Sequence, residues 1–152
     1  MATCVAGVRP PWWRDAHFLL ALAAGPAFWA SLAVWAPPRF EPDWPLRAPL
    51  VFLMPVLVYP VLEEIVFRAG LQAWLLRRSW GSRARFGVSA ANLVASLAFS
   101  ALHFLQHAPI WAAAVLVPSL VFGYFWDRFR SLAPCIALHV FYNAGYYWLF
   151  HS

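Results

Sequence analysis

Residues 49–76 read PLVFLMPVLVYPVLEEIVFRAGLQAWLL, an apolar run interrupted by Glu63, Glu64 and Arg68. The run is long enough to cross the hydrocarbon core of a bilayer as an α-helix, which takes about 20 residues. Each ionised side chain near the centre of such a helix costs about 2.5–3.5 kcal/mol. A membrane helix that keeps three of them indicates either a functional site or a buried ion pair that joins helices.

The composition of the whole chain also indicates a membrane protein. The chain has 152 residues, of which 63% are hydrophobic and 11% are charged. Soluble domains have about 45–50% apolar and about 25% charged residues. The length accommodates one domain with roughly five or six spans. We therefore expect residues 1–152 to form a single integral-membrane domain, with no second, soluble domain.

Four other apolar segments are separated from residues 49–76 by polar or charged loops. Each is long enough, or nearly so, to cross the membrane as a helix, which satisfies its own backbone hydrogen bonds in lipid. Gly25 and Pro26 predict a kink in the first of them. The sequence predicts an all-α, polytopic transmembrane helical bundle of about five spans, over residues 17–35, 49–76, 86–105, 110–126 and 132–150.

The distribution of arginine predicts how the helices are oriented. All 11 basic residues are Arg, and the formal net charge is +5. The N-terminal tail and loops 77–85 and 127–130 are Arg-rich, whereas the first loop is balanced and loop 106–109 has no Arg. The positive-inside rule then places the N-terminus in the cytoplasm and the C-terminus outside. Because these Arg residues separate apolar segments and form no basic stripe, no nucleic-acid partner is expected. The lack of Lys favours a bacterial source and hence the cytoplasmic (inner) membrane.

The two carboxylates of residues 49–76 have different expected surroundings. On a helix Glu64 and Arg68 lie one turn apart and can pair, whereas Glu63 points about 100° away. A buried ion pair that only joins helices would explain Glu64 and Arg68 but leaves Glu63 unexplained. The pattern therefore predicts one carboxylate neutralised by Arg68 and another that is free for chemistry.

Two later segments supply imidazole and amide side chains at helical spacing. In residues 96–109, SLAFSALHFLQHAP, Phe99 and His103 lie one turn apart, and His107 falls at the predicted membrane boundary. In residues 135–148, CIALHVFYNAGYYW, His139 and Asn143 lie one turn apart on one face. A single His or Asn in a span often serves only to join helices. A carboxylate, two imidazoles and an amide from three helices rarely arise from packing alone.

Together these groups suit the hydrolysis of an amide bond. A carboxylate with an imidazole can deprotonate a water molecule and pass its proton to the leaving amine. A second imidazole and an amide can donate hydrogen bonds to the oxyanion of a tetrahedral intermediate. This set predicts cleavage by water without a covalent acyl-enzyme.

Several other protease mechanisms require residues that this sequence lacks. The zinc motif HExxH is missing because Phe104 follows His103. The serine motif GxSG does not occur, and the aspartyl type needs an Asp in each of two spans, whereas Asp127 falls in a predicted loop. A thiol protease built on Cys135 and His139, one turn apart, stays open as an alternative, although reactive thiolates need an electropositive setting.

The three motifs, in this order on successive apolar segments, resemble those of the type II CAAX prenyl endopeptidase and bacteriocin-processing family, also called the Abi family. The resemblance spans about residues 50–150, and the motifs lie within residues 60–145. It implies a glutamate-dependent intramembrane endopeptidase. It assigns water activation to Glu63 and His103, the oxyanion hole to His139 and Asn143, and support of the site to Glu64 and Arg68. The motifs are Glu63-Glu64-x-x-x-Arg68, Phe99-x-x-x-His103 and His139-x-x-x-Asn143.

The resemblance also implies a substrate class. The chain is similar to compact bacterial branches of the family, some of which are linked with C-terminal sorting tails. We expect a membrane-associated protein or peptide, cut near a C-terminal sorting tail or CAAX-like end in the lipid bilayer. The alternative is a non-enzymatic membrane protein, such as a bacteriocin-immunity factor or an assembly scaffold.

The expected site contains no metal or other cofactor. Its four acidic and imidazole side chains could in principle hold a divalent cation. Arg68 beside the carboxylates, and Asn143 where a stronger ligand would be expected, argue against a cation.

Overall fold

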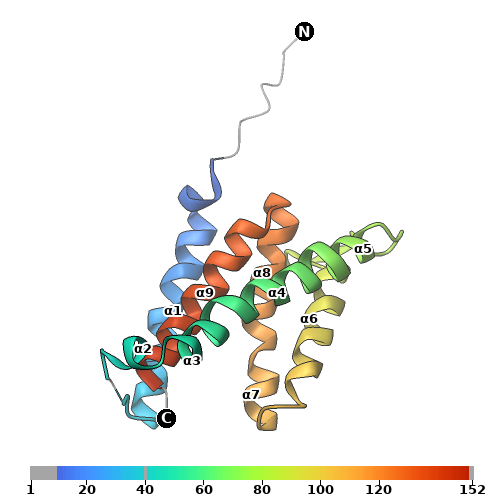
Figure 1. Cartoon of the computed structure of the whole chain (residues 1–152). Coiled ribbons are helices and arrows are strands. Elements are labelled where there is room, and N and C mark those ends of the chain that lie inside the picture. Colours follow the sequence, from blue (N-terminus) through green and yellow to red (C-terminus); the bar gives the residue numbers. More distant parts are fainter. Residues whose placement is uncertain (1–9, 40, 151–152) are drawn as a thin grey trace.

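Residues 10–39 and 41–150 are described by a computed structural model, in which long helices pack side by side (Figure 1). After the short 3₁₀-helix η1 (Trp12–Arg14), helix α1 (Ala16–Trp35) begins at Asp15, whose carboxylate accepts hydrogen bonds from the backbone N–H groups of His17 and Phe18. Such an N-cap satisfies donors that the first turn of a helix leaves free. The predicted all-α bundle is confirmed.

The apolar run that contains the three charges forms a continuous helical rod. It is composed of α3 (Pro49–Leu53), the π-helix η2 (Met54–Val58), α4 (Tyr59–Glu64), the π-helix η3 (Ile65–Gln72) and α5 (Ala73–Leu76), and it follows the short helix α2 (Trp44–Arg47). The rod crosses obliquely over the other long helices (Figure 1) and contacts three of them, α6, α8 and α9. This crossing brings its side chains to residues far away in the sequence.

The third predicted segment is shorter than expected, because its first residues form a hairpin. Strands β1 (Ala84–Arg85) and β2 (Val88–Ser89) are antiparallel, and the turn between them places Phe86 and Gly87 at φ of 54° and 80°. Helix α6 (Ala90–His103) then starts at Ser89, whose hydroxyl accepts a hydrogen bond from the backbone N–H of Asn92. At 14 residues, α6 is about 21 Å long. The predicted helix start at Phe86 was wrong.

The last two segments give three helices. Helices α7 (Pro109–Ala114) and α8 (Leu116–Phe129) follow each other directly, and α9 (Leu132–Phe150) has the predicted bounds. Asp127 was predicted to lie in a loop but belongs to α8, where its Oδ1 atom accepts a hydrogen bond from Gln72 at 3.0 Å. Because the carboxylate has a partner inside the bundle, α8 continues past the predicted end and stops at Arg130, which has a left-handed φ of 52°.

Within the described residues, three helical stretches are each long and apolar enough to span a membrane: Ala16–Trp35, Pro49–Leu76 and Pro109–Phe129. Helix α6 is apolar but shorter. Helix α9 has 19 residues, but its hydropathy is reduced by polar side chains such as His139 and Asn143. The expected segments are thus all largely helical, and the two least able to span alone carry the predicted imidazoles.

The core that holds α1, α8 and α9 together is aromatic and aliphatic. It is a cluster of buried side chains from these three helices, comprising Phe18, Phe122, Phe125, Cys135 and Leu138. Large apolar side chains are exposed on the outer faces, among them Leu20, Leu93 and Val117. This distribution suits helices that face lipid on one side and each other on the other.

Candidate active site

A carboxylate with no solvent exposure lies at the centre of the bundle. Glu64 on α4 accepts a hydrogen bond from Nε of Arg68 at 3.0 Å through Oε2. Its other oxygen, Oε1, lies 2.9 Å from Nδ1 of His139 on α9. Both Glu64 and Arg68 are fully buried. One turn of helix therefore provides the ion pair that the sequence predicts, and a side chain of α9 completes it.

Four hydrogen bonds and an aromatic ring compensate the buried charge of Arg68. Besides Glu64, its guanidinium donates to Ser119 Oγ at 2.6 Å, Gln72 Oε1 at 3.3 Å and Ser96 Oγ at 3.4 Å. It also lies 5.9 Å from the centre of the Phe99 ring. A buried charge is tolerated only when it is paired and hydrogen-bonded in this way.

The polar network continues beyond Arg68 to residues that sequence reasoning missed. Gln72 donates to the carbonyl of Gly123 at 2.9 Å and to Asp127 at 3.0 Å. Ser96 donates to Asn92, which in turn donates to the carbonyl of Leu120 at 2.9 Å. Helical spacing could have indicated these residues in the sequence. Gln72 follows Arg68 by four residues, and Ser96 follows Asn92 by four residues, so each pair lies on one helix face. These side chains connect the rod to α6 and α8 and hold Arg68 in place.

Glu63 lies in a different environment from its neighbour in the sequence. Its side chain is 32% exposed, and its Oε2 atom lies 3.6 Å from Nε2 of His139. That distance is too long for a direct hydrogen bond. His139 thus lies between two carboxylates, with Nδ1 bonded to buried Glu64 and Nε2 facing partly exposed Glu63. The predicted pairing of Arg68 with Glu64 is confirmed, and the two carboxylates approach opposite nitrogens of one imidazole.

His103 occupies the end of α6, in contact with the same aromatic ring. Its Nδ1 atom lies 2.9 Å from the backbone carbonyl oxygen of Phe99. Since a carbonyl only accepts hydrogen bonds, Nδ1 carries a hydrogen, and in the neutral ring Nε2 is an acceptor. The Phe99 ring lies 4.5 Å from the His103 ring and 6.0 Å from the His139 ring, measured between centroids. Phe99 therefore joins the two imidazoles through ring contacts.

Two more residues define the margin of the site. Asn143, one turn after His139, is half-buried and donates from Nδ2 to the carbonyl of Pro55 at 2.8 Å. His107 is exposed, and its ring stacks on that of His103 with centroids 5.6 Å apart. His107 thus lies at the margin of the site, in contact with His103. Of the six predicted residues, four are in direct contact, His103 joins them through Phe99, and Asn143 contacts the rod through Pro55.

The thiol alternative lacks the contact that it needs. Cys135 is fully buried, and its Sγ atom donates to the backbone carbonyls of Phe122 at 3.2 Å and Ser131 at 3.6 Å. In the proposed base, His139, the Nδ1 atom is bonded to Glu64 instead. A nucleophile and its base must be within hydrogen-bond reach of each other. The structure gives Cys135 no such partner.

The arrangement of the acidic and imidazole side chains bears on whether they could hold a divalent cation. Among the described residues, no group of three or more His, Cys, Asp or Glu is arranged to hold a metal ion. Glu64 directs one oxygen to Arg68 and the other to His139, so both oxygens are already in use.

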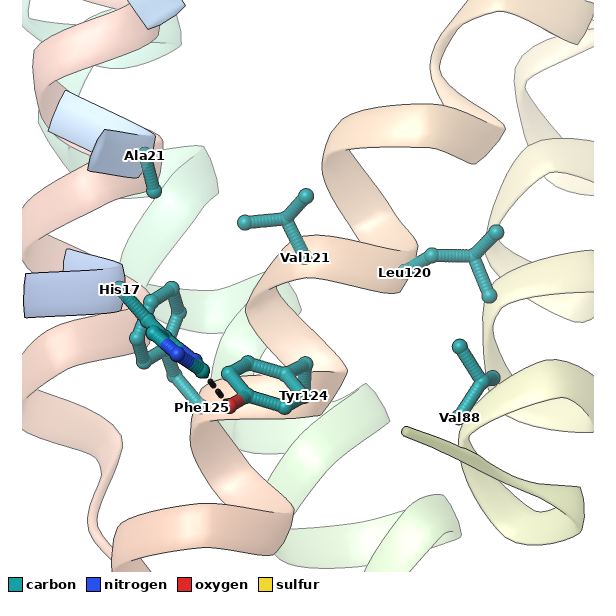
Figure 2. Close-up of a pocket in the computed structure, with 7 residues that line it drawn as sticks. All are labelled: His17, Ala21, Val88, Leu120, Val121, Tyr124 and Phe125. Carbon is teal, nitrogen blue, oxygen red and sulfur yellow. Dashed lines mark hydrogen bonds between the residues drawn. The ribbon is translucent and has the colours of Figure 1, made fainter. Parts of the chain in front are cut away.

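A groove on another part of the bundle is separate from this cluster (Figure 2). It lies between α1, β2 and α8 and is lined mainly by apolar side chains, including Val88 and Leu120. Its polar feature is a hydrogen bond of 2.5 Å between Nδ1 of His17 and the hydroxyl of Tyr124. None of the six predicted residues lines it, so the groove is not the candidate site.

Ionisable side chains gathered among the helices of a membrane bundle mark a functional site, and carboxylates beside imidazoles suit an intramembrane hydrolase. The family model described as Type II CAAX prenyl endopeptidase Rce1-like matches residues 45–145, and the chain belongs to this family. Comparisons with curated proteins and with solved structures gave no match. Family membership and the membrane-spanning helices make the chain an integral-membrane protease that acts on a protein or peptide substrate in the bilayer. The matched residues include all six predicted site residues.

Proposed function

We propose that this protease cuts a membrane-associated protein near its C-terminal end, using water activated by Glu63 and His103 and no metal or cofactor. The observation that carries the proposal is the position of His139 between two unlike carboxylates, with Glu64 at 2.9 Å and Glu63 at 3.6 Å. One carboxylate is fixed by Arg68 and the other is accessible. This arrangement supports a structural role for the first and a chemical role for the second.

In the proposed reaction the water oxygen attacks the carbonyl carbon of the scissile peptide bond. Glu63 accepts one proton from the water, and the neutral His103 ring can take up that proton at Nε2, because its Nδ1–H is bonded to the carbonyl of Phe99. The C–N bond then breaks, and the same proton is delivered to the leaving amine. The products are a new carboxyl group and a new amine.

The negative charge that develops on the carbonyl oxygen needs donors. In its doubly protonated form, His139 can donate from Nε2, while Nδ1–H stays bonded to Glu64. The Asn143 amide, one turn away on the same helix, supplies the second donor. Removing one preorganised donor of this kind lowers kcat by about 10²–10³-fold.

Glu64 and Arg68 act on the reaction through His139. The ion pair is fully buried and is bonded to side chains of α6 and α8. It fixes the orientation of the His139 ring and decides which nitrogen faces Glu63. Glu64 and Arg68 are therefore positioning residues in this proposal.

The proposed substrate has an apolar C-terminal tail that enters the bilayer, such as a sorting tail or a CAAX-like end. An apolar tail suits a site formed by helices whose outer faces carry large apolar side chains. The Arg-rich segments support a location in the bacterial cytoplasmic membrane with the N-terminus inside.

The test uses the purified protein in proteoliposomes with two synthetic peptides. One peptide carries a prenylated CAAX end, and the other an apolar segment followed by basic residues. Mass spectrometry should find one internal cut near the C-terminus of one peptide, with activity unchanged by a metal chelator and no product trapped by hydroxylamine. Loss of activity with chelator would contradict the metal-free mechanism. Cleavage of neither peptide, with a protection or assembly phenotype that survives Glu63→Gln, would favour a non-enzymatic role.

A further inference from the structure

A backbone carbonyl of the rod has lost its usual partner. Within the π-helix Met54–Val58, the N–H of Tyr59 donates to the carbonyl of Met54, five residues earlier. The carbonyl of Pro55 would be served in an α-helix by Tyr59 or in a π-helix by residue 60. Residue 60 is proline, which has no N–H. The Pro55 carbonyl therefore lacks a regular donor from its own helix.

The side chain of Asn143 on α9 supplies the missing donor. Its Nδ2 atom lies 2.8 Å from the Pro55 oxygen. A carbonyl accepts but does not donate, so the NH₂ end of the amide, and not its oxygen, must face Pro55. The same nitrogen carries a second hydrogen, and among the described residues its one hydrogen bond is to Pro55. The contact thus fixes the amide and leaves one N–H to donate elsewhere.

We propose that Pro60 is a positioning residue for catalysis: by withholding its N–H, it leaves the Pro55 carbonyl to orient the Asn143 amide toward the substrate oxyanion. This inference rests on the proposed function of Asn143 as an oxyanion donor. The π-helix is then part of the active-site design, as π-helical turns at functional sites often are. The alternative is that the contact only joins α9 to the rod, in which case it affects stability and not kcat.

The test replaces Pro60 with a residue that has an N–H. Pro60→Ala gives the Pro55 carbonyl a backbone donor that competes with Asn143 for this oxygen, so the Asn143 amide is held less tightly. Alanine favours helix, but Pro60 is fully buried and its replacement removes buried side-chain atoms, so we expect the thermal midpoint to stay close to that of the wild type. The expected kinetic result is a fall in kcat of about 10- to 100-fold with KM unchanged. Pro26→Ala is the matched control, since Pro26 lies inside α1 on an exposed position, and it should leave kcat unchanged.

A double-mutant cycle separates this effect from a displacement of nearby Glu63. If Pro60 acts through Asn143, then Pro60→Ala should have no further effect on kcat in the Asn143→Ala or Asn143→Asp background. Wild-type kcat in Pro60→Ala would overturn the inference. So would a loss of kcat on Pro60→Ala that is as large in the Asn143 variants as in the wild type. Full activity in both Asn143 variants would instead overturn the proposed oxyanion role. If neither Asn143 variant accumulates, the comparison of kcat and thermal midpoint in Pro60→Ala and Pro26→Ala decides the inference alone.

Discussion

Nδ1 of His139 and Oε1 of Glu64 lie 2.9 Å apart at the crossing of α9 and α4, although the residues are separated by 75 positions in the sequence. The other oxygen of Glu64 accepts from Arg68 at 3.0 Å. One carboxylate therefore fixes both the packing of two helices and the orientation of the imidazole. In the proposed mechanism, stability and catalysis therefore depend on the same side chain.

Glu64→Gln should destabilise the folded protein. The substitution leaves Arg68 as a buried cation without its counter-ion, and breaking a buried pair in this way costs about 3–5 kcal/mol. Unfolding of the purified protein in detergent should show the loss, together with lower accumulation in membranes. Glu41→Gln is the control, because it breaks the exposed ion pair with Arg47 and should not change the midpoint measurably. Equal midpoints for Glu64→Gln and wild type would contradict the structural role of the pair.

Gly123→Ala should also destabilise the bundle. A Cβ atom at this position on α8 would overlap the side-chain oxygen of Asn92 and crowd Gln72, both of which belong to the buried network. Overpacking of this kind costs typically about 1–3 kcal/mol. Gly70→Ala is the matched control, since its Cβ would meet only the carbonyl oxygen of Ile65 at 3.5 Å. A thermal midpoint for Gly123→Ala as high as that of Gly70→Ala would refute this packing.

The sequence predicted the local parts of this site and not the contacts between helices. The Glu64–Arg68 pair follows from spacing within one helix. The contact of Glu64 with His139 depends on the angle at which the rod crosses α9, which hydrophobic periodicity does not specify. For the same reason Ser119, whose hydroxyl lies 2.6 Å from Arg68, could not be distinguished from other small residues in apolar helices.

The errors in the predicted helix bounds have local causes. Hydropathy favours a helix from Phe86, but the turn between β1 and β2 requires a positive φ at Phe86 and Gly87, and Ser89 caps the helix instead. The charge of Asp127 indicated a loop. In the structure Asp127 stays in α8 because its carboxylate accepts a hydrogen bond from Gln72. In both cases a specific hydrogen bond or turn outweighs the average hydropathy of the segment.

The ion pair between Asp15 and Arg128 should make stability depend on pH. Burial raises the pKa of Asp15, but hydrogen bonds from Arg128 and from the backbone of Phe18 and His17 outweigh it, so the pKa lies below the ordinary value. With the folded-state pKa lowered, the stabilisation is fully present above about pH 4 and is lost as the pH falls through the folded-state value.

Asp15→Asn isolates this effect, because asparagine keeps the N-cap. At pH 7 the variant should unfold more easily than wild type by about 1–3 kcal/mol, and the difference should shrink below about pH 4. Unfolding curves of both proteins across this pH range provide the measurement. A difference that stays constant down to pH 2 would show that the charge of Asp15 is not responsible.

The two histidines near the end of α6 should differ in their effect on activity. His103→Ala removes the imidazole joined to the site through Phe99, so cleavage should fall by about 10²–10⁴-fold. His107→Ala removes an exposed ring that only stacks on His103, and its kcat should stay close to wild type. Steady-state cleavage of the same peptide by both variants provides the comparison. Equal losses in the two variants would remove the distinction between them.

In the proposed mechanism Glu63 activates water, and the kcat of Glu63→Gln in proteoliposomes measures this role. Glutamine keeps the size and hydrogen-bonding capacity of the side chain but cannot accept the proton. Since Glu63 is not part of the buried ion pair, the variant should accumulate and unfold like wild type. Its kcat should be lower by about 10²–10⁴-fold. Wild-type kcat in a folded Glu63→Gln protein would contradict water activation by Glu63.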